Sequence, residues 1–115
     1  MKGVFERVLV ELLRERGFIV EVVKQMRCER PLGGGYAKCD VIMVYHNSFW
    51  CLFWGRRYIG RIKVIDGIIT VYVKRWFSDN FNVMSVGYND FDFEFLVFFL
   101  NYRFVKGGSF IKSIL

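Results

Sequence analysis

Residues 58–75 read YIGRIKVIDGIITVYVKR, and this stretch decides the fold of the chain. Apolar and polar residues alternate on both sides of Asp66-Gly67, and a two-residue Asp-Gly loop suits the type I′ turn of a β-hairpin. Counting outward from the turn, the predicted cross-strand pairs are Ile65–Ile68, Lys63–Thr70, Arg61–Tyr72 and Ile59–Lys74. The other face is aliphatic and must be the core, so the side chains predicted to look outward are Arg61, Lys63, Thr70, Tyr72 and Lys74.

A helix and several strands are expected before this hairpin. Between Phe5 and Leu13 the apolar residues recur at the spacing of an amphipathic helix, which we place over residues 5–16 and end at Gly17. Strands are predicted at residues 18–23, 39–45 and 49–54. Pro31 and the glycines at 33–35 predict a mobile loop between the first two strands, because no regular element tolerates glycine at that density.

The apolar residues of segment 89–105 fit both the periodicity of a strand and that of a helix. Its phenylalanines alternate as in a strand at positions 91, 93 and 95, but they also follow a helical spacing through positions 95, 98 and 99. We predict a helix, because acidic residues stand at its start while Arg103, Lys106 and two glycines stand at its end. A short strand at 83–88 is expected before it, and the apolar tail 109–115 is expected to dock on its own fold or on a second subunit.

Together these elements predict an α+β fold with a single domain over residues 1–115. The N-terminal amphipathic helix comes first, followed by a mixed sheet of about five or six strands with the Asp-Gly hairpin at its centre, in line with typical sheet sizes. The C-terminal Phe-rich helix closes the core.

Composition narrows the class of protein. The chain is 54% hydrophobic and 19% aromatic, which excludes a disordered segment. The longest apolar run is shorter than the roughly 18 residues of a spanning helix, and Glu6 and Glu11 break any signal-peptide pattern, so we expect no membrane partner and an intracellular, cytoplasmic location. Ala37, Thr70 and Gln25 are each the only residue of their type, and this bias is compatible with a thermophilic source.

The charge of the chain favours a polyanionic partner. Seventeen Lys and Arg residues against eleven Asp and Glu residues give a formal net charge of +6. Nucleic acid is therefore the predicted partner, bound through its phosphates, with Tyr72 as a stacking ring. The predicted phosphate contacts are Arg56, Arg57, Arg61, Lys63 and Lys74 in the central stretch, with Arg27, Arg30 and Lys38 beside the glycine run.

The first half of the chain resembles the archaeal Holliday junction resolvases and related restriction-endonuclease-like nucleases. The resemblance rests on Lys2-Gly3, on the helix that contains Glu6 and ends before Gly17-Phe18, on the glycine run, and on Asp40-Val41-Ile42. It implies a nuclease-like fold in which Glu6 and Asp40 are the catalytic carboxylates and, in an active enzyme, hold Mg²⁺. The Glu-x-Lys that this family carries on its next strand would fall near Phe53 and Gly55 and is missing.

The predicted function is therefore a nucleic-acid-binding protein with a nuclease-like fold and an incomplete catalytic motif, without a cofactor or metal. Two alternatives stay open. One is an active Mg²⁺-dependent junction endonuclease that uses Glu6 and Asp40, since Mg²⁺ requires oxygen ligands. The other is a small structural or interaction protein that forms a homodimer through its Phe-rich helix and tail.

The cysteines do not predict a metal centre. Cys28, Cys39, His46 and Cys51 are spaced too widely for the close ligand pairs of structural zinc sites. Cys39 and Cys51 lie in apolar runs, where a free thiol behaves as a small hydrophobic side chain. Cys28 and Cys39 flank the glycine run, so a disulfide between them is the other possibility.

Overall fold

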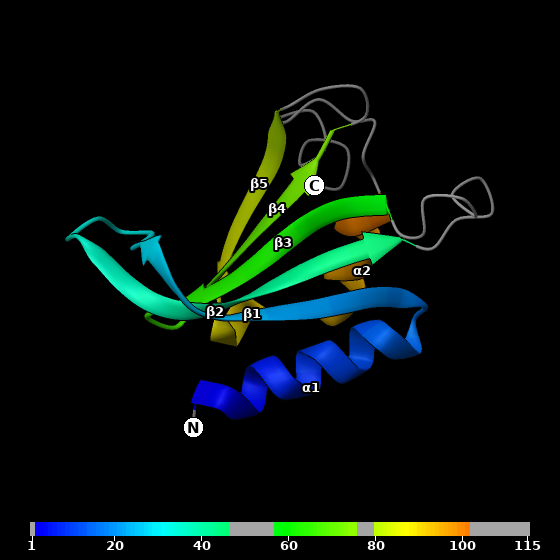
Figure 1. Cartoon of the computed structure of the whole chain (residues 1–115), viewed down its shortest axis with the longest axis horizontal. Coiled ribbons are helices and arrows are strands. Elements are labelled where there is room, and N and C mark those ends of the chain that lie inside the picture. The colour runs from blue at the N-terminus through cyan, green and yellow to red at the C-terminus, as the bar shows by residue number, and fades with distance from the viewer. Residues whose placement is uncertain (1, 47–56, 76–79, 102–115) are drawn as a thin grey trace.

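Two α-helices and a five-stranded sheet make up the part of the chain that the computed structural model describes, which is residues 2–46, 57–75 and 80–101 (Figure 1). The elements are α1 (Lys2–Glu15), β1 (Phe18–Glu29), β2 (Tyr36–His46), β3 (Arg57–Ile65), β4 (Ile68–Lys74), β5 (Phe81–Gly87), a 3-10 turn (Tyr88–Asp90) and α2 (Phe93–Asn101). The strand order follows the sequence, so each strand pairs with its neighbour along the chain. This arrangement confirms the α+β class.

The prediction of a mixed sheet is wrong, because all four pairings between the described strands are antiparallel. Parallel neighbours need a crossover connection of about a dozen residues or more, usually a helix. Here the turns at 31–35 and at Asp66-Gly67 are short, and both helices lie outside the run of five strands. The strand predicted at 49–54 and the tail 109–115 lie outside the described residues.

The β3–β4 hairpin turns at Asp66 and Gly67, whose φ angles of 54° and 75° are both positive, as a type I′ turn requires. Ile65 lies opposite Ile68, Lys63 opposite Thr70 and Arg61 opposite Tyr72. The predicted pair Ile59–Lys74 would put Ile59 on the same face as Arg61 and is wrong, since the Ile59 side chain is only 1% exposed and lies in the core. A bulge between β2 and β3 at this point breaks the alternation on which the count depended.

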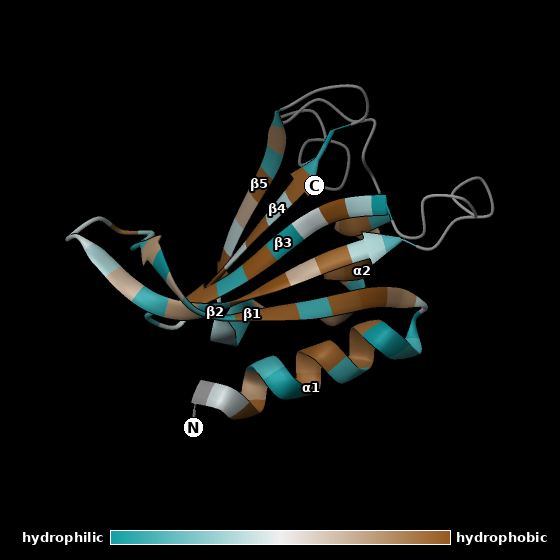
Figure 2. Cartoon of the chain, viewed as in Figure 1, coloured by the Kyte–Doolittle hydropathy of each residue, from teal (hydrophilic) through white to brown (hydrophobic). Residues whose placement is uncertain are grey.

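The main core lies between the two helices and one face of the sheet, here called the inner face. Leu9 and Leu13 of α1 and Leu96 and Leu100 of α2 pack against inner-face residues that include Ile42, Ile62, Ile69, Val71 and Val73. Apolar and polar residues alternate along β3 in Figure 2, as expected for a strand with one buried face. Within the described chain no helix is long and apolar enough to cross a membrane.

The start of α2 explains why the C-terminal segment is helical from residue 93 and not from residue 89. The carboxylate of Asp92 accepts a hydrogen bond from the backbone N–H of Glu94 at 3.0 Å, and its carbonyl accepts one from Leu96 at 3.1 Å. An Asp in this position is a favoured N-cap. The predicted helix is thus confirmed for Phe93–Asn101, and residues 102–105 lie outside the described residues.

The ends of β1 and β2 form a hairpin, here called the arm (residues 26–39), which curls away from the helices in Figure 1. A bulge between Val23 and Met26 starts it, with Gln25 at a φ of 59°. Cys28 and Cys39 of the arm pack with Val41 and Ile65 in a second, smaller core. Because Val41 lies opposite Lys63, this second core is on the outer face of the sheet, the face opposite the helices.

Candidate nucleic-acid interface

A basic–aromatic surface, consisting of Arg61, Lys63, Tyr72, Lys74 and Phe81, occupies the outer face of β3, β4 and β5. Strand pairing brings these side chains together, because Arg61 lies opposite Tyr72 and Lys74 lies opposite Phe81. Alternation along each strand then directs them away from α1 and α2. Both described helices cover the inner face, so neither covers this surface (Figure 1).

Arg61 is the centre of the basic–aromatic surface. Its guanidinium carbon lies 4.7 Å from the centroid of the Tyr72 ring and 5.1 Å from that of Phe81. The ammonium nitrogen of Lys63 lies 5.0 Å from the Tyr72 centroid. Cation–π attraction at these distances holds both cations against the rings. The positive charges of Arg61 and Lys63 are therefore held against the rings of Tyr72 and Phe81.

The row of rings continues toward the end of β2. Tyr58 packs edge-to-face against Phe81 at 6.5 Å and against Tyr45 at 5.7 Å between centroids. Tyr72 and Phe81 meet in the same geometry, at 6.4 Å and 88°. Burial raises the pKa of Tyr58 above its ordinary value, while the charge of Arg61 partly opposes this rise. The Tyr58 hydroxyl thus stays neutral near pH 7 and adds no negative charge beside the cations.

The structure brings together four of the predicted contacts, Arg61, Lys63, Tyr72 and Lys74, on the basic–aromatic surface. Arg57 lies at the start of β3, opposite His46. Thr70 lies on the outer face opposite Lys63, as predicted, but it is buried there, and its hydroxyl accepts a hydrogen bond from Ser85 at 3.4 Å. Arg56 lies outside the described residues.

The predicted contacts on the arm belong to a different surface. Arg27 lies opposite Lys38. Each is followed along its strand by a cysteine, Cys28 or Cys39, whose side chain packs on the outer face. By strand alternation, Arg27 and Lys38 face the other way. Both are exposed, and the guanidinium of Arg27 lies 4.4 Å from the ring centroid of Tyr36. The eight predicted contacts that the structure describes are thus divided between two sides of the sheet.

Glu6 and Asp40, the carboxylates of the nuclease resemblance, line one cavity of about 300 Å³ at the N-terminal end of α1. The other residues that line it include Gly3, Gln25, Arg30, Lys38, Val64, Ile65, Asp66 and Tyr88. One oxygen of Asp40 already accepts a hydrogen bond from the backbone N–H of Gln25 at 3.1 Å, at the bulge of β1. Asp66 is paired with Arg30.

This set of oxygens does not fit Mg²⁺. The ion needs oxygen ligands in near-octahedral geometry, but the one further carboxylate that lines the cavity, Asp66, is paired with Arg30. The positions of the missing Glu-x-Lys, near Phe53 and Gly55, lie outside the described residues. Among the described residues, no group of three or more His, Cys, Asp or Glu side chains comes close enough to hold a metal ion. We therefore assign no catalytic step to Glu6 and Asp40.

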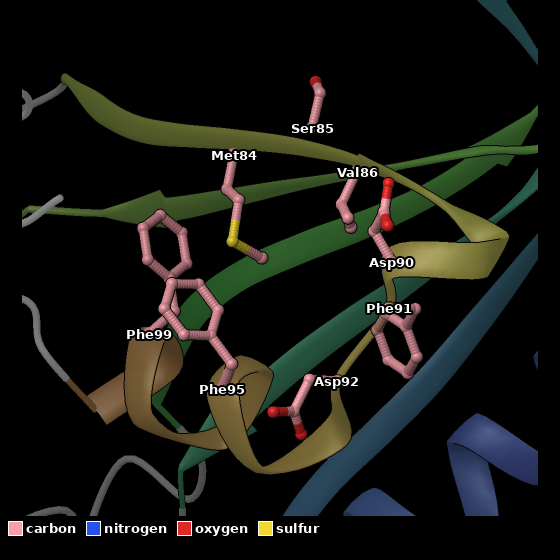
Figure 3. A pocket seen from close by; sticks show the side chains of 8 residues that line it. All are labelled: Met84, Ser85, Val86, Asp90, Phe91, Asp92, Phe95 and Phe99. Atoms are coloured by element: carbon pink, nitrogen blue, oxygen red, sulfur yellow. The ribbon is translucent and has the colours of Figure 1, made fainter. Parts of the chain in front are cut away.

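A second cavity, of about 320 Å³, lies between β5 and α2. Figure 3 shows Met84 and Val86 pointing into it from β5, with Phe95 and Phe99 on α2, whereas Ser85 points to the other side of the strand. Asp90 and Asp92 lie at its end. Its lining is largely apolar and suits an apolar group better than a phosphate.

The sequence predicted Tyr72 as a ring of the interface but not the other aromatic residues of these surfaces, which are Tyr36, Tyr45, Tyr58 and Phe81. Phe81 falls before the strand predicted at 83–88, although it alternates with Val83 and Ser85 as a strand residue does. Tyr58 belongs to the predicted hairpin, but the bulge at Ile59 places its side chain on the face opposite to the one that simple alternation gives.

No family model, no curated protein and no solved structure matches this chain in comparisons with known proteins.

Proposed function

We propose that this chain binds nucleic acid through the basic–aromatic surface. The observation that carries the proposal is the gathering of Arg61, Lys63 and Lys74 beside the rings of Tyr72 and Phe81 on a face that the described helices leave open. Arginine and lysine neutralise phosphates, and aromatic rings beside them are typical of surfaces that bind nucleic acid. The net charge of +6 supports the same partner, because it attracts a polyanion over a distance.

Phosphate binding gives this proposal a measurable signature. Each neutralised phosphate releases condensed counterions, so the logarithm of the association constant falls with the logarithm of salt concentration by about 0.7 for each phosphate of a single strand. Removal of two cations from the basic–aromatic surface, in Arg61→Ala/Lys63→Ala, should therefore lower the slope by about 1.4.

The test is a salt titration of binding, followed by fluorescence anisotropy, with a labelled oligothymidine of about 16 nucleotides, a length within the site size of one small domain. The matched control is Arg27→Ala/Lys38→Ala, which removes the same charge from the arm on the opposite side of the sheet. The control should keep the wild-type slope, and thermal melts should show that both variants fold. A slope that changes only in the arm variant would contradict the assignment to the basic–aromatic surface, and no binding by the wild type would contradict the function.

A further inference from the structure

The guanidinium group of Arg61 lies against two rings, and Arg61 as a whole is only half-buried, so part of its side chain remains accessible to a ligand. Tyr72 and Phe81 stand edge-to-face and lie 4.7 and 5.1 Å from the guanidinium carbon. Arginine is planar and stacks on rings, whereas lysine is a compact point charge. The contacts to both rings hold this plane in place before any ligand arrives, which reduces the entropy lost on binding.

We infer that the ligand of the basic–aromatic surface is a single-stranded nucleic acid and that one of its bases stacks on the guanidinium plane of Arg61. This inference rests on the proposed function and names its substrate class. Unpaired bases stack on aromatic side chains and on arginine planes, and such stacking is largely independent of base identity. A base in a duplex has its faces covered by its neighbours, so it cannot take this position.

The lysines of the same surface suit the phosphates on either side of that base. Lys63 is the next outward residue along β3 from Arg61, and Lys74 is the next along β4 from Tyr72. Lys63 is also held against the Tyr72 ring, at 5.0 Å. The cations thus flank the stacking position on two neighbouring strands, which is the arrangement that a bound single strand needs, with its bases on a platform and its backbone between positive charges.

Two substitutions at one position separate stacking from charge. Arg61→Lys keeps the positive charge and loses the plane, whereas Arg61→Gln keeps a planar amide and loses the charge. The matched control is Arg27→Lys on the arm, which makes the same exchange at a guanidinium that also lies against a ring, that of Tyr36, on the other side of the sheet. The probes are labelled oligothymidine, a duplex of the same length, and inorganic polyphosphate as a polyanion without bases.

The wild type should bind oligothymidine more tightly than the duplex. Arg61→Lys should weaken oligothymidine binding about tenfold, within the range for loss of one stacked base, while the salt slope and the affinity for polyphosphate stay unchanged. Arg61→Gln should show the reverse pattern, with a salt slope lower by about 0.7 and a smaller loss of affinity at high salt. Arg27→Lys should behave as the wild type with all three probes.

The outcomes separate this inference from the proposed function. If Arg61→Lys bound oligothymidine as tightly as the wild type does, stacking on Arg61 would be overturned. Binding of oligothymidine by the wild type would still support the proposed binding of nucleic acid. Equal affinity of the wild type for duplex and single strand would overturn the substrate class. If a thermal melt shows that Arg61→Lys is unfolded, Arg61→Gln tests the stacking instead. At high salt, Arg61→Gln should then bind oligothymidine more tightly than a folded Arg61→Ala variant, and equal affinities would overturn the stacking.

Discussion

Arg30, near the tip of the arm, reaches across the fold to Asp66 in the turn between β3 and β4. One of its guanidinium nitrogens lies 2.7 and 2.6 Å from the two carboxylate oxygens of Asp66. Arg30 is thereby tied to a structural partner, and this explains why it does not extend the basic–aromatic surface. The side chains stay 37% and 46% exposed, so the pair is a surface ion pair with a modest energy.

Asp66 should contribute to stability through both this ion pair and its backbone conformation. Asp66→Asn loses the charge but keeps a residue that tolerates a positive φ, and we expect it to lower the free energy of unfolding by about 0.5 kcal/mol. Asp66→Ala should cost about 1 kcal/mol more, because alanine is strained at a φ of 54°. Urea unfolding measures both, with Arg30→Ala as the control that removes only the ion pair. Equal losses for the two Asp66 variants would show that the turn conformation contributes nothing.

Gly60 lies opposite Val73, where the backbone of β4 leaves no room for a β-carbon. A β-carbon at this position would lie 3.0 Å from the Cα of Val73 and would clash with the carbonyl oxygen of Tyr72. We expect Gly60→Ala to destabilise the chain by about 3 kcal/mol or more, since backbone cannot yield as a flexible side chain does. Gly3→Ala is the control, because no atom lies within 4 Å of its β-carbon position. Thermal melts that leave the two variants alike would refute this packing.

The buried thiol of Cys39 should make stability fall at alkaline pH. Burial, together with the neighbouring Cys28 whose sulfur lies 2.9 Å away, raises the pKa of Cys39 from 9.0 to about 12. Above pH 9 the unfolded chain gives up this proton while the folded chain keeps it, so unfolding is favoured progressively between pH 9 and pH 12. Both cysteines are free thiols in the structure.

The measurement is the free energy of unfolding from pH 7 to pH 11 for the wild type and for Cys39→Ala. The variant should be less stable at pH 7, because a buried sulfur is lost, but its stability should fall less steeply above pH 9. Parallel curves for the two proteins would mean that other groups carry the alkaline loss. Reducing agent must be present throughout, so that a disulfide between Cys28 and Cys39 does not form.

We expect no cleavage of four-way DNA junctions in Mg²⁺ or Mn²⁺. The sequence lacks the Glu-x-Lys of the resembling family, the further carboxylate of the cavity, Asp66, is paired with Arg30, and one oxygen of Asp40 is engaged by the backbone of Gln25. Asp40→Asn, which keeps an acceptor for that backbone N–H, should fold as the wild type, whereas Asp40→Ala should lose about 1 kcal/mol. Cleavage by the wild type that Asp40→Asn abolishes would restore the endonuclease alternative.

The sequence predicted those helices and strands whose apolar residues follow a single periodicity. The spacing of Leu9 and Leu13 gave α1, and the Asp66-Gly67 turn gave the pairing of Arg61 with Tyr72, because hydrophobic periodicity and turn chemistry act within a few residues. Gly17 has a φ of 91° and follows α1, as a glycine at the end of a helix should.

Features that depend on pairing between strands could not be derived in the same way. The bulges at Ile59 and Gln25 have no local signature, yet they decide that Ile59 is buried and that β1 continues to Glu29. The division of the predicted contacts between two sides of the sheet follows from these pairings, so no count of basic residues along the chain could reveal that Arg27 and Arg61 face apart. Likewise, the partner of Arg30 is a residue 36 positions away.

The order of the strands also has a consequence for folding during synthesis. Among the described strands, each pairs only with its neighbours along the chain, so the sheet can be assembled in the order in which the ribosome delivers it. Leu96 and Leu100, however, emerge only after the five described strands, and until then α1 is the one described helix that can cover the aliphatic inner face around Ile69 and Val71. We therefore expect a nascent chain whose five described strands are already paired to expose part of this hydrophobic face, which is the kind of surface that chaperones bind.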